Sequence, residues 1–329
     1  MFMELSRACY KVAKDLAKVK PGENVLVLSD TIIEREVIDG VTAAAYSLGA
    51  EAVQMIYETR LDLNMKPPNN VIAAMRDSDC TIMFVKMYFC HSPWYVDLKK
   101  ELKGRTMQFA GVDKDRMLRM IERVDYDSMC ILEDKIAELL RGGSYMEVST
   151  PGGVDLTLEI VPEESRASWH TEIGGHTGTT PIIETMNGTI VIDGFIYPPQ
   201  EIGVVKNPIK LNIEKGKITK ISGQHEAKIL ENWLKKLNDP GMYLCAHQNF
   251  GNHPGAKITD FPIESERFYG CCEYGFGGMA HGRNTRKATT HYDMSCKYAT
   301  VTLDGKLILK DGKYVAPELA ELDEKIRPF

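Results

Sequence analysis

The chain has 329 residues, of which 43% are hydrophobic and 26% charged, so it can bury one large core or two of ordinary size. Its formal net charge of -6 gives no broad positive field of the kind that draws proteins onto phosphate backbones or anionic lipids. Nucleic acid and membrane surfaces are therefore not expected partners.

Two further features bear on where the protein works. Residues 1–7 show no basic region followed by an apolar stretch and a cleavage site, and no apolar run reaches the ~20 residues that a membrane span needs. The eight cysteines are scattered and form no Cys-x-x-Cys pair, a pattern typical of free thiols in a reducing compartment. We therefore expect a cytoplasmic protein. Cys271 and Cys272 are adjacent, which is a poor arrangement for chelating one ion, and their pattern predicts no role.

The first half of the chain alternates short β-rich runs with helical stretches. Residues 24–28 are predicted as a buried strand, and residues 33–48 have the helical spacing of apolar residues up to Gly49. Further strands are expected at 52–57, 81–87 and 105–109, with helices around 71–75 and 96–102. These four β/α units indicate a Rossmann-like parallel sheet covered by helices. No Gly-x-Gly-x-x-Gly run follows the first strand, so no dinucleotide site is predicted.

A long amphipathic segment, residues 113–140, leads to Arg141-Gly142-Gly143, where cations and glycine mark the end of a helix. We place a domain boundary there. Residues 1–143 then form an α/β domain, and residues 144–329 form a β-rich α+β domain. The second domain is expected to contain a helix at about 226–237 and strands at 145–149, 154–160, 189–195, 209–214 and 217–222.

Functional groups gather in three glycine- and histidine-rich runs of the second half, which the sequence predicts as loops: 170–178, 246–254 and 290–293. In an extended strand, residues i and i+2 point to the same face, so His291 and Asp293 can present an imidazole and a carboxylate to one ion. A His-x-Asp pair with one more distant histidine is also the ligand set of non-haem Fe(II) oxygenases. Taken alone, the pair is equally consistent with a strand end that faces solvent.

Several motifs of the second half occur together in a known superfamily. They are Phe250-Gly251-Asn252-His253-Pro254, Glu264-Ser265-Glu266-Arg267 with Gly270, His291-Tyr292-Asp293 and Thr302-Leu303-Asp304-Gly305. This series resembles the C-terminal signature of the aminopeptidase T family of metallopeptidases and of the related 2,5-dihydroxypyridine 5,6-dioxygenases, which share its fold. The resemblance extends back through Asn187-Gly188-Thr189 and residues 150–157, and loosely over the α/β half, so it covers most of the chain.

The two branches of that superfamily differ at the metal. Aminopeptidase T enzymes hold two ions with glutamates, a histidine and the closing His-x-Asp. In this chain His176 and His247 stand where two glutamates would fall, and Glu273 stands where the additional histidine would be. These departures count against a two-metal peptidase site. The dioxygenase branch holds one Fe(II) with two histidines and an aspartate, which implies His247, His291 and Asp293 as the ligands here.

The dioxygenase branch also uses histidines beside the metal for acid-base work, which implies that role for His176 and His91. His91 has independent support as a site residue. It lies in Cys90-His91-Ser92-Pro93-Trp94, at the end of a strand of the α/β domain, and strand ends are where open α/β sheets place their ligands.

Three other histidines of these regions are further candidates. His281 is the first substitute if His247 is not a ligand. His170 and His253 are expected to be hydrogen-bonding residues of loops, because a buried histidine must satisfy both ring nitrogens.

Three glutamates are candidates as well. Glu264 and Glu266 are expected to share one face of a strand, as ligands of a second metal, as general bases, or as partners of Arg267 and Arg286, with the ion pair favoured. Glu273 is a third candidate base.

Two chemistries are open. The favoured one is a ring-cleaving dioxygenase, in which the oxygens of a small hydroxylated N-heteroaromatic such as 2,5-dihydroxypyridine chelate Fe(II) and a histidine removes a hydroxyl proton. The alternative is a metal-dependent hydrolase of a peptide or cyclic amide, in which Zn2+, Co2+ or Mn2+ lowers the pKa of a bound water towards ~7. A third reading, a binding protein without activity, is less favoured because histidine-rich glycine loops indicate a reactive pocket. The related families are homo-oligomers, so at least a dimer is expected.

Overall fold

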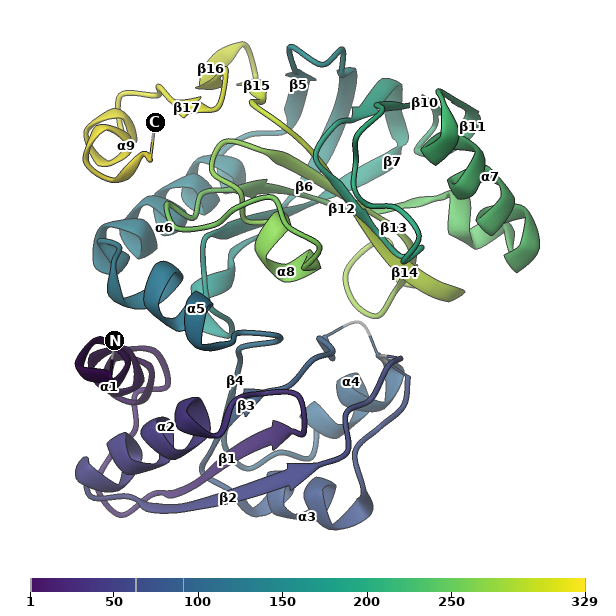
Figure 1. Ribbon diagram of the computed structural model, residues 1–329. Helices are drawn as coiled ribbons and strands as arrows, with labels where there is room; N and C mark the ends of the chain where they lie inside the picture. Colours follow the sequence, from purple (N-terminus) through teal and green to yellow (C-terminus); the bar gives the residue numbers. More distant parts are fainter. Residues whose placement is uncertain (1, 63, 91, 329) are drawn as a thin grey trace. The chain divides into compact units, whose positions relative to one another are not determined.

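The computed structural model describes all residues except 1, 63, 91 and 329 (Figure 1). The chain divides into two compact units. The first comprises Met1–Tyr126 and Trp169–Ile173, and the second comprises Asp127–Ser168 and Gly174–Phe329. The chain thus leaves the second unit for five residues and returns to it at Gly174. The domain boundary predicted near residue 143 stays a prediction.

The first unit contains the four-stranded parallel sheet that the β/α alternation predicts. The strand order is β2-β1-β3-β4. The central strands β1 and β3 are apolar runs buried on both faces, as expected for a parallel sheet that helices cover. Its elements are α1 (Phe2–Lys11), β1 (Asn24–Asp30), α2 (Arg35–Ser47), β2 (Glu51–Tyr57), α3 (Asn69–Asp77), β3 (Cys80–Phe84), α4 (Pro93–Lys99), β4 (Arg105–Gln108) and α5 (Lys114–Arg116).

The amphipathic segment at 113–140 is not one continuous helix. It consists of α5, a π-helical turn at Met117–Glu122, and α6 (Tyr126–Arg141). Asp113 begins α5 by accepting a hydrogen bond from the Arg116 amide at 2.9 Å. The π turn buries Met117, Leu118, Met120 and Ile121, a denser apolar set than one α-helical stripe would face inward.

The second unit is built on a large antiparallel sheet with the path β17-β16-β15-β5-β6-β7-β12-β13-β14-β8-β9, and the hairpin β10–β11 pairs with β7. Its strands are β5 (Tyr145–Ser149), β6 (Asp155–Ala167), β7 (His176–Ile192), β8 (Phe195–Tyr197), β9 (Gly203–Val204), β10 (Ile209–Glu214), β11 (Lys217–Ser222), β12 (Cys245–Gly251), β13 (Cys272–Met279), β14 (Arg286–Cys296), β15 (Thr300–Leu303), β16 (Lys306–Lys310) and β17 (Lys313–Tyr314). Its helices besides α6 are α7 (His225–Leu237), α8 (Pro262–Ser265) and α9 (Ala320–Ile326).

All three of the histidine- and glycine-rich runs lie wholly or partly in strands rather than in the predicted loops. His176 begins β7, His247 lies in β12, which is buried along its whole length, and residues 290–293 lie within β14. Glycine is present in these strands for a reason of space: a Cβ at Gly178 would clash with the side chain of Asn249 on the neighbouring strand. A strand that is buried on both faces cannot leave polar side chains to water, so those of β12 must find partners or a ligand within the protein.

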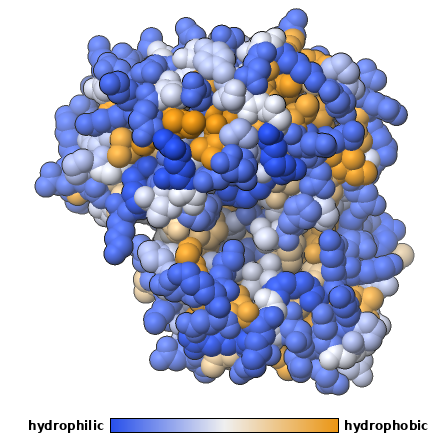
Figure 2. Space-filling model, turned by 180° about the vertical axis from the view of Figure 1, so that it is seen from behind, coloured by the Kyte–Doolittle hydropathy of each residue, from blue (hydrophilic) through white to orange (hydrophobic). Residues whose placement is uncertain are grey.

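The surface is mostly polar. Hydrophilic residues cover most of the face in Figure 2, and hydrophobic side chains appear there in separate groups. All eight cysteines are free, as predicted. Within the described residues, no helix is long and apolar enough to cross a lipid bilayer.

Candidate metal centre

Three side chains converge on one face of the sheet of the second unit. His247 lies on β12, and His291 and Asp293 lie on β14, with β13 between the two strands. In the register of the sheet, Gly275 of β13 stands opposite His247 on one side and opposite Asp293 on the other. The predicted same-face relationship of His291 and Asp293 follows directly from the strand period of two.

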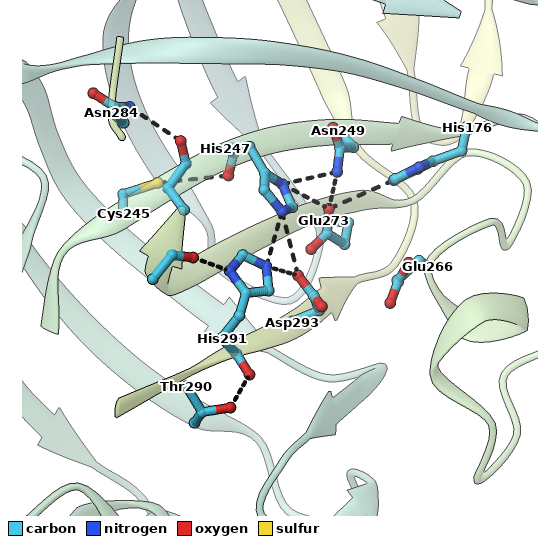
Figure 3. Close-up of polar contacts among 12 residues, drawn as sticks. His176, Cys245, His247, Asn249, Glu266, Glu273, Asn284, Thr290, His291 and Asp293 are labelled. Atoms are coloured by element: carbon cyan, nitrogen blue, oxygen red, sulfur yellow. Dashed lines mark hydrogen bonds and ion pairs between the residues drawn. The ribbon is translucent and has the colours of Figure 1, made fainter. Parts of the chain in front are cut away.

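The three potential ligand atoms form a small triangle (Figure 3). Nε2 of His291 lies 2.9 Å from Oδ1 of Asp293 and 3.0 Å from Nε2 of His247, and the third side, from His247 Nε2 to Asp293 Oδ1, is 3.5 Å. Neighbouring ligands of an octahedral ion with bonds of ~2.1 Å are about 3.0 Å apart. Two neutral imidazoles and one carboxylate at this spacing fit one divalent cation, bound on one triangular face. Among the residues described, this is the cluster whose spacing suits an ion.

The electrostatics of the triangle favour a cation. Burial would raise the pKa of Asp293, but the adjacent His291 holds that pKa below its usual range, so the carboxylate is charged. Burial and the neighbouring His291 lower the pKa of His247 to about 3, which keeps its imidazole neutral. The Asp293 carboxylate outweighs burial at His291 and raises the pKa of that imidazole, so a bound cation would replace the proton there.

Each ligand imidazole has a partner for its second nitrogen. Nδ1 of His291 lies 2.7 Å from the Gly278 carbonyl and donates to it, which leaves the Nε2 lone pair for an ion. Nδ1 of His247 lies 2.9 Å from the side-chain nitrogen of Asn249 and 3.5 Å from Oε2 of Glu273. The Asn249 nitrogen can only donate, and Nε2 can bind an ion only when Nδ1 carries the proton, so Glu273 is the acceptor for that proton when an ion is bound. The side-chain nitrogen of Asn249 also donates to Glu273 and so holds this carboxyl beside the metal-facing ring of His247.

The His247 ring packs against the backbone of Gly275, which has no side chain. A Cβ at Gly275 would clash with the ring of His247, in particular with Nε2 and its neighbouring carbons. The ring therefore lies flat across β13, and only glycine leaves room for it.

Two polar groups lie next to the triangle. Glu273 of β13 is fully buried, and burial together with the Asp293 charge raises the pKa of its carboxyl well above the usual range. His176, at the start of β7, points towards Glu273, with its Nε2 3.6 Å from Oε2 (Figure 3). Burial and the Arg267 charge lower the pKa of His176 well below its usual range. Within the described part of the chain, His176 Nε2 has no hydrogen-bond partner. His91 lies outside the described residues.

The strand predicted for Glu264 and Glu266 is wrong. Pro262 starts the short helix α8, and Glu266 directly follows it, because proline favours the first turn of a helix. Glu264 accepts a hydrogen bond from the Lys257 amide at 2.9 Å, and Glu266 lies 3.5 Å from Nη1 of Arg267. The ion pair favoured for Glu266 is thus present, while neither carboxylate belongs to the triangle.

The remaining candidate histidines also lie outside the triangle. His281 is in the connection between β13 and β14, close enough for its charge to lower the pKa of His247. His253 is fully buried and accepts a hydrogen bond at Nδ1 from the Gly255 amide. His170 lies in the five-residue stretch of the first unit.

Sequence reasoning did not single out Asn249. The strand period could have found it, because Asn249 follows His247 by two residues and so shares its face.

The chain is similar to known proteins in sequence and in fold. The family described as 2,5-dihydroxypyridine 5,6-dioxygenase matches residues 5–316. A 2,5-dihydroxypyridine 5,6-dioxygenase of Pseudomonas putida KT2440 is 27% identical over 267 residues, covering 75% of each chain. The structure of a 2,5-dihydroxypyridine dioxygenase from the same organism matches with a TM-score of 0.81 and 21% identity over 97% of this chain and 99% of that one. AmpT from Thermus thermophilus matches with a TM-score of 0.65 and 13% identity over 95% and 99%. The two structural matches show a shared fold.

Proposed function

The chain belongs to the 2,5-dihydroxypyridine 5,6-dioxygenase family and is a dioxygenase, and we propose that it uses one Fe(II), held by His247, His291 and Asp293, to open the ring of a small hydroxylated N-heteroaromatic. The substrate class follows the named activity of the Pseudomonas putida relative, 2,5-dihydroxypyridine cleavage.

The observation that carries this proposal is the triangle of two imidazole nitrogens and one carboxylate oxygen with sides of 2.9, 3.0 and 3.5 Å. Two histidines and one carboxylate on one face of an ion are the ligand set of non-haem Fe(II) oxygenases. When bound, Fe(II) would offer open positions at which substrate oxygens and O2 are brought together and activated. Thiolates, which would favour other metals, are absent from the triangle.

His176 is the residue we propose as the base for a substrate hydroxyl. It lies next to the metal triangle, with its Nε2 3.6 Å from Oε2 of Glu273, and its imidazole is neutral, which is the form that can accept a proton. Its Nε2 has no hydrogen-bond partner among the described residues, so that lone pair is not already used by the protein. His91 stays a sequence-based candidate for a second acid-base residue.

The hydrolase alternative has weaker support. The likeness to AmpT concerns the fold alone at 13% identity. A two-metal hydrolase needs a second set of charged ligands, and among the described residues the cluster whose spacing suits an ion is the single triangle of His247, His291 and Asp293.

The test is metal analysis combined with an oxygen-dependent assay. Protein purified without oxygen is expected to contain about one iron per chain, and to consume 2,5-dihydroxypyridine and O2 in equal amounts. Turnover that continues unchanged under argon would exclude a dioxygenase reaction for this substrate. Two zinc, cobalt or manganese ions per chain with peptide cleavage would support the hydrolase instead.

A further inference from the structure

A buried carboxyl group outside the metal centre contacts the backbone on both sides of Trp169–Ile173, the segment of the chain that belongs to the first unit. Glu133 of α6 is fully buried. It accepts a hydrogen bond from the Gly175 amide at 2.6 Å and another from the Ser168 amide. Ser168 is the last residue before the chain leaves the second unit, and Gly175 is the second residue after it returns. One side chain therefore ties together the two ends of the segment Trp169–Ile173.

The returning end consists of two glycines, which directly precede His176. Gly174 and Gly175 have φ angles of +81° and +79°, a conformation that other residues rarely adopt. A Cβ at Gly175 would also clash with His253. Glycine is the residue with the largest backbone freedom, so a pair of glycines would leave the next residue loosely held unless other groups fix them.

Other groups do fix them. Arg267 donates from Nε to the Gly174 carbonyl at 3.0 Å, and the Asn252 amide donates to the Gly175 carbonyl at 2.9 Å. Arg267 is itself 1% exposed and is anchored by a 2.8 Å hydrogen bond from Nη1 to the Ile263 carbonyl. Burying a charged group costs free energy unless the group is paired and hydrogen-bonded. Holding Gly174-Gly175 with a buried glutamate and a buried arginine therefore costs more free energy than holding it with neutral residues would.

His176 depends on this turn for its orientation. Its Nε2 has no hydrogen-bond partner within the described residues, and Glu273 lies at 3.6 Å, beyond hydrogen-bond length. The direction of the ring is then set by its backbone, that is, by the two glycines before it and by the pairing of His176 with Gly251 of β12.

We propose that Glu133 and Arg267 are positioning residues that clamp Gly174-Gly175 and thereby aim His176 for proton transfer from the substrate. This inference rests on the proposed function, because it assumes that His176 is the base. A purely structural reading, in which the clamp only closes the turn, predicts lower stability but no specific link to His176.

A double-mutant cycle separates the two readings. Turnover is measured for Glu133→Gln, His176→Ala and the double variant, each loaded with iron and compared at equal iron content. Loss of the base should lower kcat by roughly 100-fold or more, and loss of its positioning by about 10- to 100-fold. Because Glu133 acts through His176, the double variant should be no slower than His176→Ala. Glu226→Gln is the matched control, since Glu226 is a buried carboxyl of α7 that accepts from the Asn207 amide; its kcat should be unchanged.

A second readout does not depend on the loaded enzyme. In metal-free protein with 15N-labelled histidine, the His176 imidazole should be neutral and sharply defined in the wild type. In Glu133→Gln the signals of this ring should broaden or double as the ring loses its fixed position, while in Glu226→Gln they should stay sharp. If Glu133→Gln is too unstable to study, Arg267→Lys replaces it in the same cycle and in the same spectra.

The outcomes are distinct. If Glu133→Gln has wild-type kcat, or if its effect multiplies with that of His176→Ala, the positioning role is wrong while the proposed function stands. If His176→Ala itself turns over at the wild-type rate, the assignment of the base is wrong and the inference falls with it.

Discussion

Nε2 of His291 lies 2.9 Å from Oδ1 of Asp293, and one residue, Tyr292, separates the two along β14. A strand brings both side chains to one face without any turn or loop. Because the neighbours of β14 in the sheet fix its register, the pair is rigid before any ion arrives, and His247 of β12 completes the triangle from two strands away.

Removing either member of this pair should abolish metal binding. For His291→Ala and Asp293→Ala we expect almost no iron after purification without oxygen, because two remaining ligands cannot hold a divalent ion against dilution. His225→Ala, which changes an exposed histidine at the start of α7, is the control and should keep its iron. Metal content per chain by elemental analysis is the measurement, and full iron retention in either ligand variant would refute the assigned triangle.

Gly275→Ala should weaken the metal without unfolding the sheet. The new Cβ would occupy the space of the His247 ring and push its Nε2 away from His291 and Asp293. We expect at least a ~10-fold loss of iron affinity, the scale seen when groups that orient a ligand are changed. Gly142→Ala, directly after α6 and outside the triangle, meets its nearest atoms at 3.4 Å, an ordinary contact, and should bind iron normally. Equal iron affinities for the two variants in a chelator titration would contradict the conclusion that Gly275 leaves room for the His247 ring.

Asn249→Leu should also weaken metal binding. The change removes the side-chain nitrogen that holds Glu273 beside Nδ1 of His247 while keeping a side chain of similar size. An imidazole that loses the partner of its second nitrogen is free to rotate, so a 10- to 100-fold loss of affinity is expected. Binding isotherms with Fe(II), or with Co(II) as a spectroscopic substitute, check this. An unchanged affinity would mean that packing alone orients the His247 ring.

The stability of the metal-free protein should depend on the Glu133 carboxyl. Burial raises the pKa of this carboxyl from 4.5 to about 7, so between those values the folded chain binds a proton that the unfolded chain has released. Stability from this group is therefore present at low pH and is lost as the pH rises from about 4.5 to about 7, by up to roughly 3 kcal/mol in total.

The measurement is the free energy of unfolding in urea at several pH values, for the wild type and for Glu133→Gln. The glutamine variant cannot titrate, so the difference between the two proteins should shrink or change sign across this window. Parallel pH profiles would show that the folded-state pKa of Glu133 is not raised.

The sequence predicted the parts of the fold that depend on regular patterns. The runs around Val25–Leu28 and Cys80–Phe84 are almost entirely apolar, with Thr81 as the polar exception, and this pattern predicts their place in a parallel sheet. The runs containing His176 and His247 were predicted as loops, because glycine and polar residues normally mark loops. In this protein the glycines make room for neighbouring side chains within strands, a tertiary cause that no local pattern reveals.

In the candidate site, too, local spacing predicts some of the residues, while others come together only through tertiary contacts. His291 and Asp293 could be paired from the strand period alone, while His247 was chosen only through the family resemblance. No sequence pattern marks Glu133, because a glutamate within an amphipathic helix usually faces solvent, and only the folded chain brings the Ser168 and Gly175 amides to it. The spacing of Glu264 and Glu266 predicts a strand, whereas Pro262 starts a short helix there.

The ladder of main-chain hydrogen bonds through β12, β13 and β14 holds the three donor atoms independently of any ion. Chelation and unfolding are therefore separate events in this protein, in contrast to small zinc domains that collapse when the metal is withdrawn. Stripped protein should keep the amide exchange protection of these strands and accept fresh metal without a refolding step.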